Sequence, residues 1–265
     1  MHSTFTIIKK YIQYYTKASN GKGHGVHSPF VYDFIRNVLM DKSKPDSALQ
    51  IEMHRDALKK NTTSIEVWDR GAGSRQMITR HRKVNKIAAS SLKPQKYAHL
   101  LYRIVAYFKP ENVIEMGTSL GITTCYLATA ANGKQVVTME GAPTVAKIAG
   151  AHFEKMGLQN IQMVEGDFDQ TLPEVLKKLG TVGLAYIDGN HKYIPTMQYF
   201  NDLLLKSNEA SFFIFDDIHW SEEMENAWEQ IKAHPAVTVT IDLFYIGLVF
   251  LRKEDKEPMH YLIRY

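Results

Sequence analysis

Short hydrophobic, β-branched runs alternate with longer amphipathic stretches through the second half of the chain. The runs span residues 112–116, 135–140, 161–165, 182–187 and 211–215. This alternation is typical of βαβ units that build a parallel sheet, where ligands bind at the carboxyl ends of the strands. Two later runs, 237–244 and 247–252, follow each other too closely for a crossover helix and predict an antiparallel pair. We therefore expect an α/β, Rossmann-like, doubly wound and mostly parallel seven-stranded sheet with an antiparallel last strand, and residues 260–265 as a candidate edge strand.

The first 93 residues lack this alternation and predict helices instead. Ser28 and Pro29 form a helix start, with Ser as the N-cap and Pro at the first helical position. A further helix is expected after Pro94, where apolar residues recur at helical spacing. We expect residues 1–93 to form an N-terminal helical extension or cap, and residues 94–265 to form the sheet domain.

Charge and cysteine content narrow the class of protein. Residues 1–100 carry 18 basic and 7 acidic side chains, and residues 101–265 carry 14 and 21, so the acidic excess lies in the half with the predicted sheet. Cys125 is the single cysteine, which excludes an intrachain disulfide and fits a reducing compartment. The longest apolar run, 243–251, has nine residues, whereas a bilayer-spanning helix needs about 20. We expect a cytoplasmic protein without a membrane partner.

A glycine-containing loop follows the first predicted strand of the sheet. Residues 113–121 read as a strand, a loop with Gly117 and Gly121, and a helix start. Glycines let the backbone approach a ligand closely, and a helix N-terminus presents free N–H groups. The next strand ends in Glu140, which is placed to accept hydrogen bonds from ribose hydroxyls. Glu115 adds a second carboxylate, and two acids there suit a cationic sulfonium ligand better than a pyrophosphate.

An earlier stretch, residues 65–74, also reads as a strand entering a glycine loop. No strand with a terminal acid follows it at the right distance, and basic residues follow instead. We therefore expect a structural turn there.

Motifs at the ends of four predicted strands carry a family resemblance. They are the acid-glycine loop with Thr118-Ser119, the acid Glu140, Gly166-Asp167-Phe168, and Asp188-Gly189-Asn190-His191-Lys192-Tyr193. Over roughly residues 91–252 the chain resembles class I S-adenosylmethionine-dependent methyltransferases, closest to the catechol and caffeoyl-CoA O-methyltransferase group and bacterial relatives with a D-G-x-H-x-Y motif. The resemblance implies that residues 94–265 bind S-adenosylmethionine. It assigns the methionine end of the cofactor to Glu115, Gly117, Ser119, Gly121 and Thr123, the ribose to Glu140, and the adenine to Asp167 and Phe168.

Three carboxylates follow the fourth and fifth predicted strands. Asp188 and the pair Asp216-Asp217 are separated by enough chain for one helix and one strand, so all three should reach the same edge of the sheet. Unpaired carboxylates in one cleft repel each other unless they are protonated or share a cation. Oxygen ligands of this kind select a hard ion such as Mg²⁺. The resembling catechol-type enzymes have Asn where this chain has Asp217, and the alternative is that the acids are turn and capping residues.

His191 stands where the resembling enzymes carry a catalytic Lys, and is a suitable general base near neutral pH. With Asp188 it forms the predicted catalytic pair, while His219 and Trp220 are candidates for lining the acceptor pocket. We expect O-methylation of a small hydroxylated acceptor, with Mg²⁺ assistance as one option. One alternative is methylation of RNA or protein, which the excess of basic residues in positions 1–100 suggests. Another is cofactor binding without methyl transfer. The Asp-Gly-Asn-His segment argues against nucleic acid as a partner. A homodimer is possible on the sequence alone.

Overall fold

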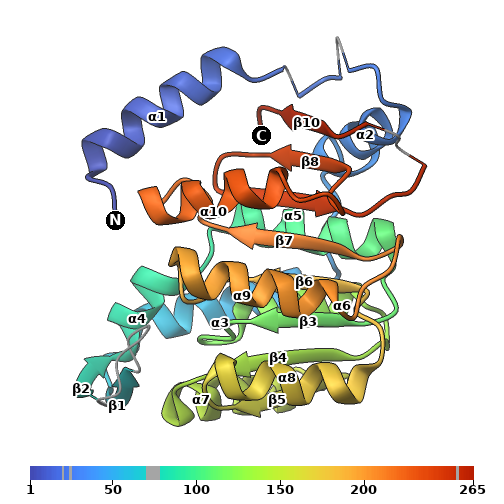
Figure 1. Cartoon of the computed structure of the whole chain (residues 1–265). Coiled ribbons are helices and arrows are strands. Elements are labelled where there is room, and N and C mark those ends of the chain that lie inside the picture. The colour runs from blue at the N-terminus through green and yellow to red at the C-terminus, as the bar shows by residue number, and fades with distance from the viewer. Residues whose placement is uncertain (20, 24–25, 70–77, 255–256) are drawn as a thin grey trace. The chain divides into compact units, whose positions relative to one another are not determined.

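The hydrophobic runs form strands, and the stretches between them form helices, in the computed structural model of the chain (Figure 1). The structure describes residues 1–19, 21–23, 26–69, 78–254 and 257–265. The chain divides into a central unit, residues 43–178, and a terminal unit, residues 1–42 and 179–265. The boundary expected between residues 93 and 94 separates two helices of the central unit and stays a prediction. None of the helices in the described ranges is long and apolar enough to cross a membrane.

The central unit contains a three-stranded parallel arrangement in the order β3-β4-β5. Strand β3 is buried along its whole length, as expected for a parallel strand that is covered on both faces. Helix α5 packs against α6, and α7 packs against β4 and β5. The elements are α3 (Ala48–Lys60), β1 (Ser64–Asp69), β2 (Ile78–Lys83), α4 (Val84–Ser91), α5 (Gln95–Phe108), β3 (Val113–Met116), α6 (Ile122–Ala130), β4 (Val136–Glu140), α7 (Pro143–Lys155), β5 (Ile161–Glu165) and α8 (Phe168–Leu179).

Strands β1 and β2 form a separate antiparallel hairpin of the central unit. The first part of the upstream stretch, predicted to be a strand, is therefore β1. The turn predicted for its glycines lies outside the described residues.

The terminal unit contains five strands in the order β10-β8-β9-β7-β6. Strand β9 is antiparallel to both of its neighbours, which confirms the predicted antiparallel pair, and the tail adds β10 parallel to β8. Ser28 caps α2 and Pro29 opens it, as expected. The elements are α1 (Thr4–Lys17), α2 (Pro29–Phe34), the π-helical continuation η1 (Ile35–Leu39), β6 (Leu184–Ile187), α9 (Tyr193–Leu204), β7 (Phe212–Asp216), α10 (Glu222–Lys232), β8 (Val239–Asp242), β9 (Ile246–Phe250) and β10 (Met259–Leu262).

Candidate functional site

The loop between β3 and α6 adopts backbone conformations that favour glycine. Gly117 has φ 111°, Ser119 has φ 48° and Gly121 has φ 79°. The backbone N–H groups of Gly117 and Thr118 both donate to the carbonyl of Met139 at 3.0 Å, which ties the loop to strand β4. The loop is therefore a fixed turn at the carboxyl end of the parallel strands, where α/β folds bind their ligands.

Gly121 has a second, steric reason to lack a side chain. A Cβ atom there would lie 2.6 Å from a ring carbon of Phe153 and 3.0 Å from the Cβ of Ala149, both on α7. Its role in packing α6 against α7 therefore exists whether or not the loop touches a cofactor. Thr123, in the first turn of α6, is 9% exposed.

Glu115 is a buried carboxylate on β3, with 0% of its surface exposed. The hydroxyls of Thr124 and Thr138 each donate to its Oε2 at 2.6 Å. Its Oε1 is buried without a hydrogen-bond partner among the described residues. Burial raises the pKa of Glu115 to about 7, against the opposing effect of the two hydroxyls and with a smaller contribution from the charge of Glu140. The side chain thus holds one unused acceptor, which a cationic ligand group would satisfy.

Glu140, at the end of β4, holds the glycine loop in place by hydrogen bonding. The backbone N–H of Ser119 donates to its Oε2 at 2.8 Å, and the N–H of Ala142 donates to its Oε1 at 2.9 Å. Burial raises the pKa of this carboxyl, and the backbone hydrogen bonds counteract that effect. Each carboxylate oxygen can accept a second hydrogen bond, so these contacts leave acceptor capacity for a diol.

Asp167 and Phe168 follow β5, the third parallel strand of the central unit. Both are partly buried. The carbonyl of Asp167 accepts from the N–H groups of Gln170 and Thr171, and its Oδ1 accepts from the N–H of Asp169 at 3.1 Å, so Asp167 begins helix α8. The eight predicted cofactor residues therefore all belong to the central unit, at or just after the carboxyl ends of β3, β4 and β5.

Asp188 and His191 lie together after β6 in the terminal unit. His191 Nε2 is 3.6 Å from Asp188 Oδ1, and the hydroxyl of Tyr186 donates to Asp188 Oδ2 at 2.9 Å. The two side chains are 19% and 26% exposed for Asp188 and His191 respectively, so the imidazole is accessible from solvent. A carboxylate that orients a partly exposed imidazole is a recurrent arrangement for a general base.

Asp216 and Asp217 end strand β7, the parallel neighbour of β6. Asp216 is completely buried, whereas Asp217 is partly exposed, has φ 54° and donates its N–H to the carbonyl of Tyr245 at 2.7 Å. Across the described ranges no three His, Cys, Asp or Glu side chains are placed to share a metal ion. The predicted Mg²⁺ site at Asp188, Asp216 and Asp217 therefore stays a prediction.

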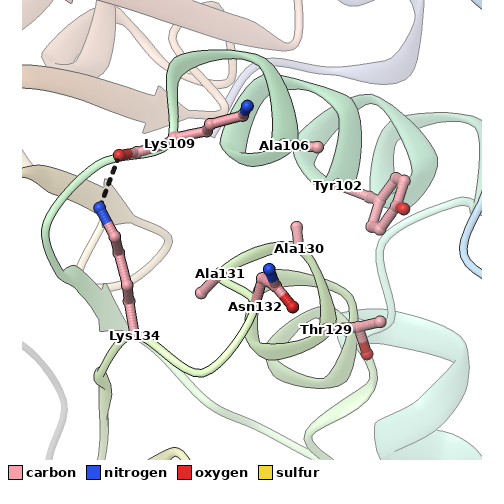
Figure 2. A pocket seen from close by; sticks show the side chains of 8 residues that line it. All are labelled: Tyr102, Ala106, Lys109, Thr129, Ala130, Ala131, Asn132 and Lys134. Carbon is pink, nitrogen blue, oxygen red and sulfur yellow. Dashed lines mark hydrogen bonds between the residues drawn. The ribbon is translucent and has the colours of Figure 1, made fainter.

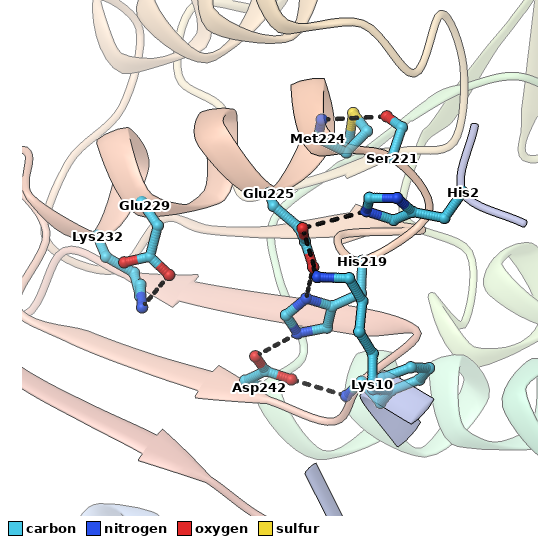
Figure 3. Close-up of polar contacts among 10 residues, drawn as sticks. His2, Lys10, His219, Ser221, Met224, Glu225, Glu229, Lys232 and Asp242 are labelled. Carbon is cyan, nitrogen blue, oxygen red and sulfur yellow. Dashed lines mark hydrogen bonds and ion pairs between the residues drawn. The ribbon is translucent and has the colours of Figure 1, made fainter. Parts of the chain in front are cut away.

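His219 belongs to a polar network that the sequence did not reveal (Figure 3). Its Nε2 lies 2.8 Å from Asp242 Oδ2, and its Nδ1 lies 3.2 Å from Glu225 Oε1. Lys10 Nζ and His2 Nε2 also contact Glu225, at 2.8 and 3.2 Å. Burial lowers the pKa of His219, but the hydrogen bonds and charges of the two carboxylates outweigh it and raise that pKa. His219 is therefore a hydrogen-bonded link in this network. Together with Trp220 it also lines a small pocket beside Asp217, Phe244 and Tyr245, so its predicted place in the acceptor site stays a prediction.

A cavity of about 410 Å³ lies in the central unit among Tyr102, Ala106, Lys109, Thr129, Ala130, Ala131, Asn132 and Lys134 (Figure 2). Lys134 Nζ donates there to the carbonyl of Lys109 at 3.1 Å. These residues precede β3 and β4, so the cavity is at the opposite strand ends from the glycine loop. It contains none of the predicted site residues.

Comparison with known proteins identifies a domain within the chain. Residues 114–218 match the family model described as "Methyltransferase domain". The chain carries a methyltransferase domain. This match begins in β3 and ends just after β7, so it includes the glycine loop and the predicted site acids Glu115, Glu140, Asp167, Asp188, Asp216 and Asp217. No curated protein matches the chain.

Solved structures similar to this methyltransferase agree in fold. The SAM complex of the O-methyltransferase TomG from Streptomyces achromogenes, involved in tomaymycin synthesis, is 18% identical, with a TM-score of 0.52 over 61% of this chain and 82% of its own. An O-methyltransferase from Bacillus cereus in complex with SAH is 18% identical, with a TM-score of 0.56 over 83% and 97%. The SAH-bound methyltransferase PaMTH1 from Podospora anserina is 10% identical, with a TM-score of 0.60 over 96% and 98%. The predicted fold class is thereby confirmed, and the family match over residues 114–218 agrees with the predicted methyltransferase domain.

Proposed function

We propose that this methyltransferase transfers a methyl group from S-adenosylmethionine to a hydroxyl oxygen of a small acceptor. The observation that carries the proposal is Glu115, a buried carboxylate with an unused oxygen next to the glycine loop. An unpaired buried charge is costly unless a partner arrives. The amino group of a bound S-adenosylmethionine would be such a partner. The similar structures described as O-methyltransferases support the oxygen acceptor.

The remaining cofactor contacts follow from the positions of the strand ends. Glu140 would accept from the ribose hydroxyls while it keeps the N–H of Ser119. Asp167 and Phe168 would contact the adenine, and Gly117, Ser119, Gly121 and Thr123 would surround the methionine end of the cofactor. When bound, the cofactor would supply a methyl group attached to a positively charged sulfur. After the transfer that sulfur is a neutral sulfide.

His191 would take the proton of the acceptor hydroxyl at its imidazole. Asp188 stabilises the resulting imidazolium, because its Oδ1 lies 3.6 Å from His191 Nε2, and the Tyr186 hydroxyl holds the carboxylate in place through Oδ2. A phenol has an ordinary pKa near 10, so a base at this position would matter most at neutral pH. The acceptor is therefore an alcohol or phenol that can reach an imidazole paired with a carboxylate.

Calorimetric titration of the full chain with S-adenosylhomocysteine tests the cofactor. Binding by the wild type, with NAD binding weaker or absent, supports the proposal, and tighter binding of NAD would refute it. Mass spectrometry of a vicinal-diol phenol incubated with S-adenosylmethionine tests the transfer. Mg²⁺ assistance remains a prediction: activity that disappears with EDTA and returns with Mg²⁺ would support it, and full activity in EDTA would reject it.

A further inference from the structure

Helix α1 uses only part of its apolar surface to pack on the terminal unit. Tyr14 is buried, its hydroxyl donates to the carbonyl of Ile263, and its ring lies 5.3 Å from that of Phe244. Lys10, in the middle of the helix, contacts Glu225 at 2.8 Å. The helix is thus held with one definite face toward the unit.

A second apolar face of α1 is exposed. Phe5, Ile8, Ile12 and Tyr15 are exposed by 78%, 53%, 57% and 52%. Their spacing of three, four and three residues places them in one stripe along the helix. Met1, just before the helix, is 84% exposed and extends the apolar segment. Large apolar side chains exposed as a contiguous group mark an interaction surface, whereas single exposed ones do not.

The segment that carries this stripe has formal side-chain charges of one sign. Residues 1–32 contain four lysines and neither Asp nor Glu. Lys9 follows Phe5 by one helical turn and is exposed, as is Lys17. At the end of the stripe the guanidinium of Arg264 lies 4.5 Å from the centre of the Tyr15 ring. The surface that borders the apolar stripe is therefore basic.

We propose that α1 binds the surface of an anionic lipid membrane, with Phe5, Ile8, Ile12 and Tyr15 inserted and Lys9 and Lys17 at the level of the headgroups. An amphipathic helix with aromatic and aliphatic residues on one face and lysines on the polar face lies in the plane of the interface in this way. Anionic headgroups attract basic residues near the surface. A helix of 14 residues is too short to span the bilayer, so the contact is peripheral.

A second copy of the chain is the competing occupant. The stripe has the a and d spacing of a two-helix seam, but two copies would bring the lysines of both helices together with no acid from residues 1–32 to pair with them. An anionic membrane supplies the missing negative charge. This inference departs from the expectation that no membrane is a partner, because that expectation considered only spanning segments, and the exposed face of α1 is defined only once its packed face is known.

Flotation of the full chain with vesicles tests the proposal. The vesicles contain either phosphatidylcholine alone or phosphatidylcholine with phosphatidylglycerol. We expect stronger binding to the anionic vesicles and weaker binding at high salt. The double substitution Phe5→Ser with Ile12→Ser should reduce binding about tenfold or more, because burial of large apolar side chains is lost. Lys9→Gln with Lys17→Gln should reduce it about fivefold or more on anionic vesicles only.

Leu205→Ser is the matched control, because Leu205 is 82% exposed but lies outside the stripe, at the end of α9. It should bind as the wild type does, and circular dichroism with thermal unfolding should show that all variants remain folded. The proposal is overturned if the wild type does not float with anionic vesicles, or if the Phe5/Ile12 variant floats equally well. It is also overturned if sedimentation shows a lipid-free dimer that this variant dissociates, which would assign the stripe to a second copy.

Discussion

Replacing Glu115 by Gln should make the free protein more stable and its cofactor binding weaker. Glu115 is fully buried, and burial is the chief reason that its carboxyl has a pKa of about 7 instead of its ordinary value of 4.5. That difference corresponds to about 3 kcal/mol between the two protonation states. The wild type therefore carries an unfavourable buried charge at neutral and higher pH in the absence of a ligand.

The direction of the pH dependence follows from proton binding. Between pH 4.5 and about 7 the folded protein holds a proton on Glu115 that the unfolded chain has already released. Raising the pH across this window therefore lowers the free energy of unfolding. Glu115→Gln has no such titration, and its amide oxygen can still accept from Thr124 and Thr138. Its stability relative to the wild type should rise across the window and level off above about pH 7, at no more than about 3 kcal/mol.

Urea unfolding at a series of pH values, compared between the wild type and the variant, measures this difference directly. Glu165→Gln is the matched control, because Glu165 is an exposed carboxylate at the end of strand β5, in the same group of parallel strands. Calorimetry with S-adenosylhomocysteine should show binding weaker by about 1.5–3 kcal/mol in Glu115→Gln, the range for a hydrogen bond to a charged group. A variant that is less stable than the wild type at pH 8, or that binds the cofactor product equally well, would refute the reasoning.

Three further predictions concern the loop and the base. Glu140→Ala should weaken S-adenosylhomocysteine binding by about 1.5–3 kcal/mol, measured by calorimetry, because the ribose loses a charged acceptor; unchanged affinity in a folded variant would remove the assignment. Gly121→Ala should lower the free energy of unfolding by about 1–3 kcal/mol, measured in urea, because its Cβ would meet Phe153 at 2.6 Å. Gly133→Ala, at φ 87° with nothing within 4 Å, tests backbone strain alone, and an equal loss there would contradict the steric explanation. His191→Ala should reduce turnover about a hundredfold at neutral pH and less at high pH, where the acceptor ionises unaided; a pH-independent loss in the rate profile would argue against a base.

The parallel strands and the residues at their carboxyl ends were predictable from the sequence, because both depend on local signals. A short β-branched run indicates a buried strand, and the residue that follows it is placed at a known edge of the sheet. Glu115, Glu140 and Asp188 could be named for this reason. The hydrogen-bond partners of each side chain could not be predicted from the sequence. The hydroxyls of Thr124 and Thr138, which donate to Glu115, lie 9 and 23 residues away from it in the chain.

The His219 network shows the limit of local signals more strongly. Lys10 and Glu225 are separated by 215 positions, and no periodicity links them. The sequence offered His219 only as a candidate for lining the acceptor pocket, and it did not show that Asp242 and Glu225 contact its two ring nitrogens. The exposed apolar stripe on α1 could not be predicted from local signals either. Its residues are visible in the sequence, but part of the apolar surface of the helix is packed on the terminal unit and part is exposed, and only the fold separates the two.

Burial of Glu115 is unfavourable in the free protein and marks this position as a candidate binding site. Parallel strands that are buried on both faces normally read as continuous apolar runs, and β3 departs from that rule at Glu115 alone. Two threonine hydroxyls satisfy one of its oxygens and leave the other without a partner. A sequence that breaks a local rule without compensation in the free protein points to function at that position. A cationic group of the ligand would complete the site, so cofactor binding and relief of the buried charge would be the same event.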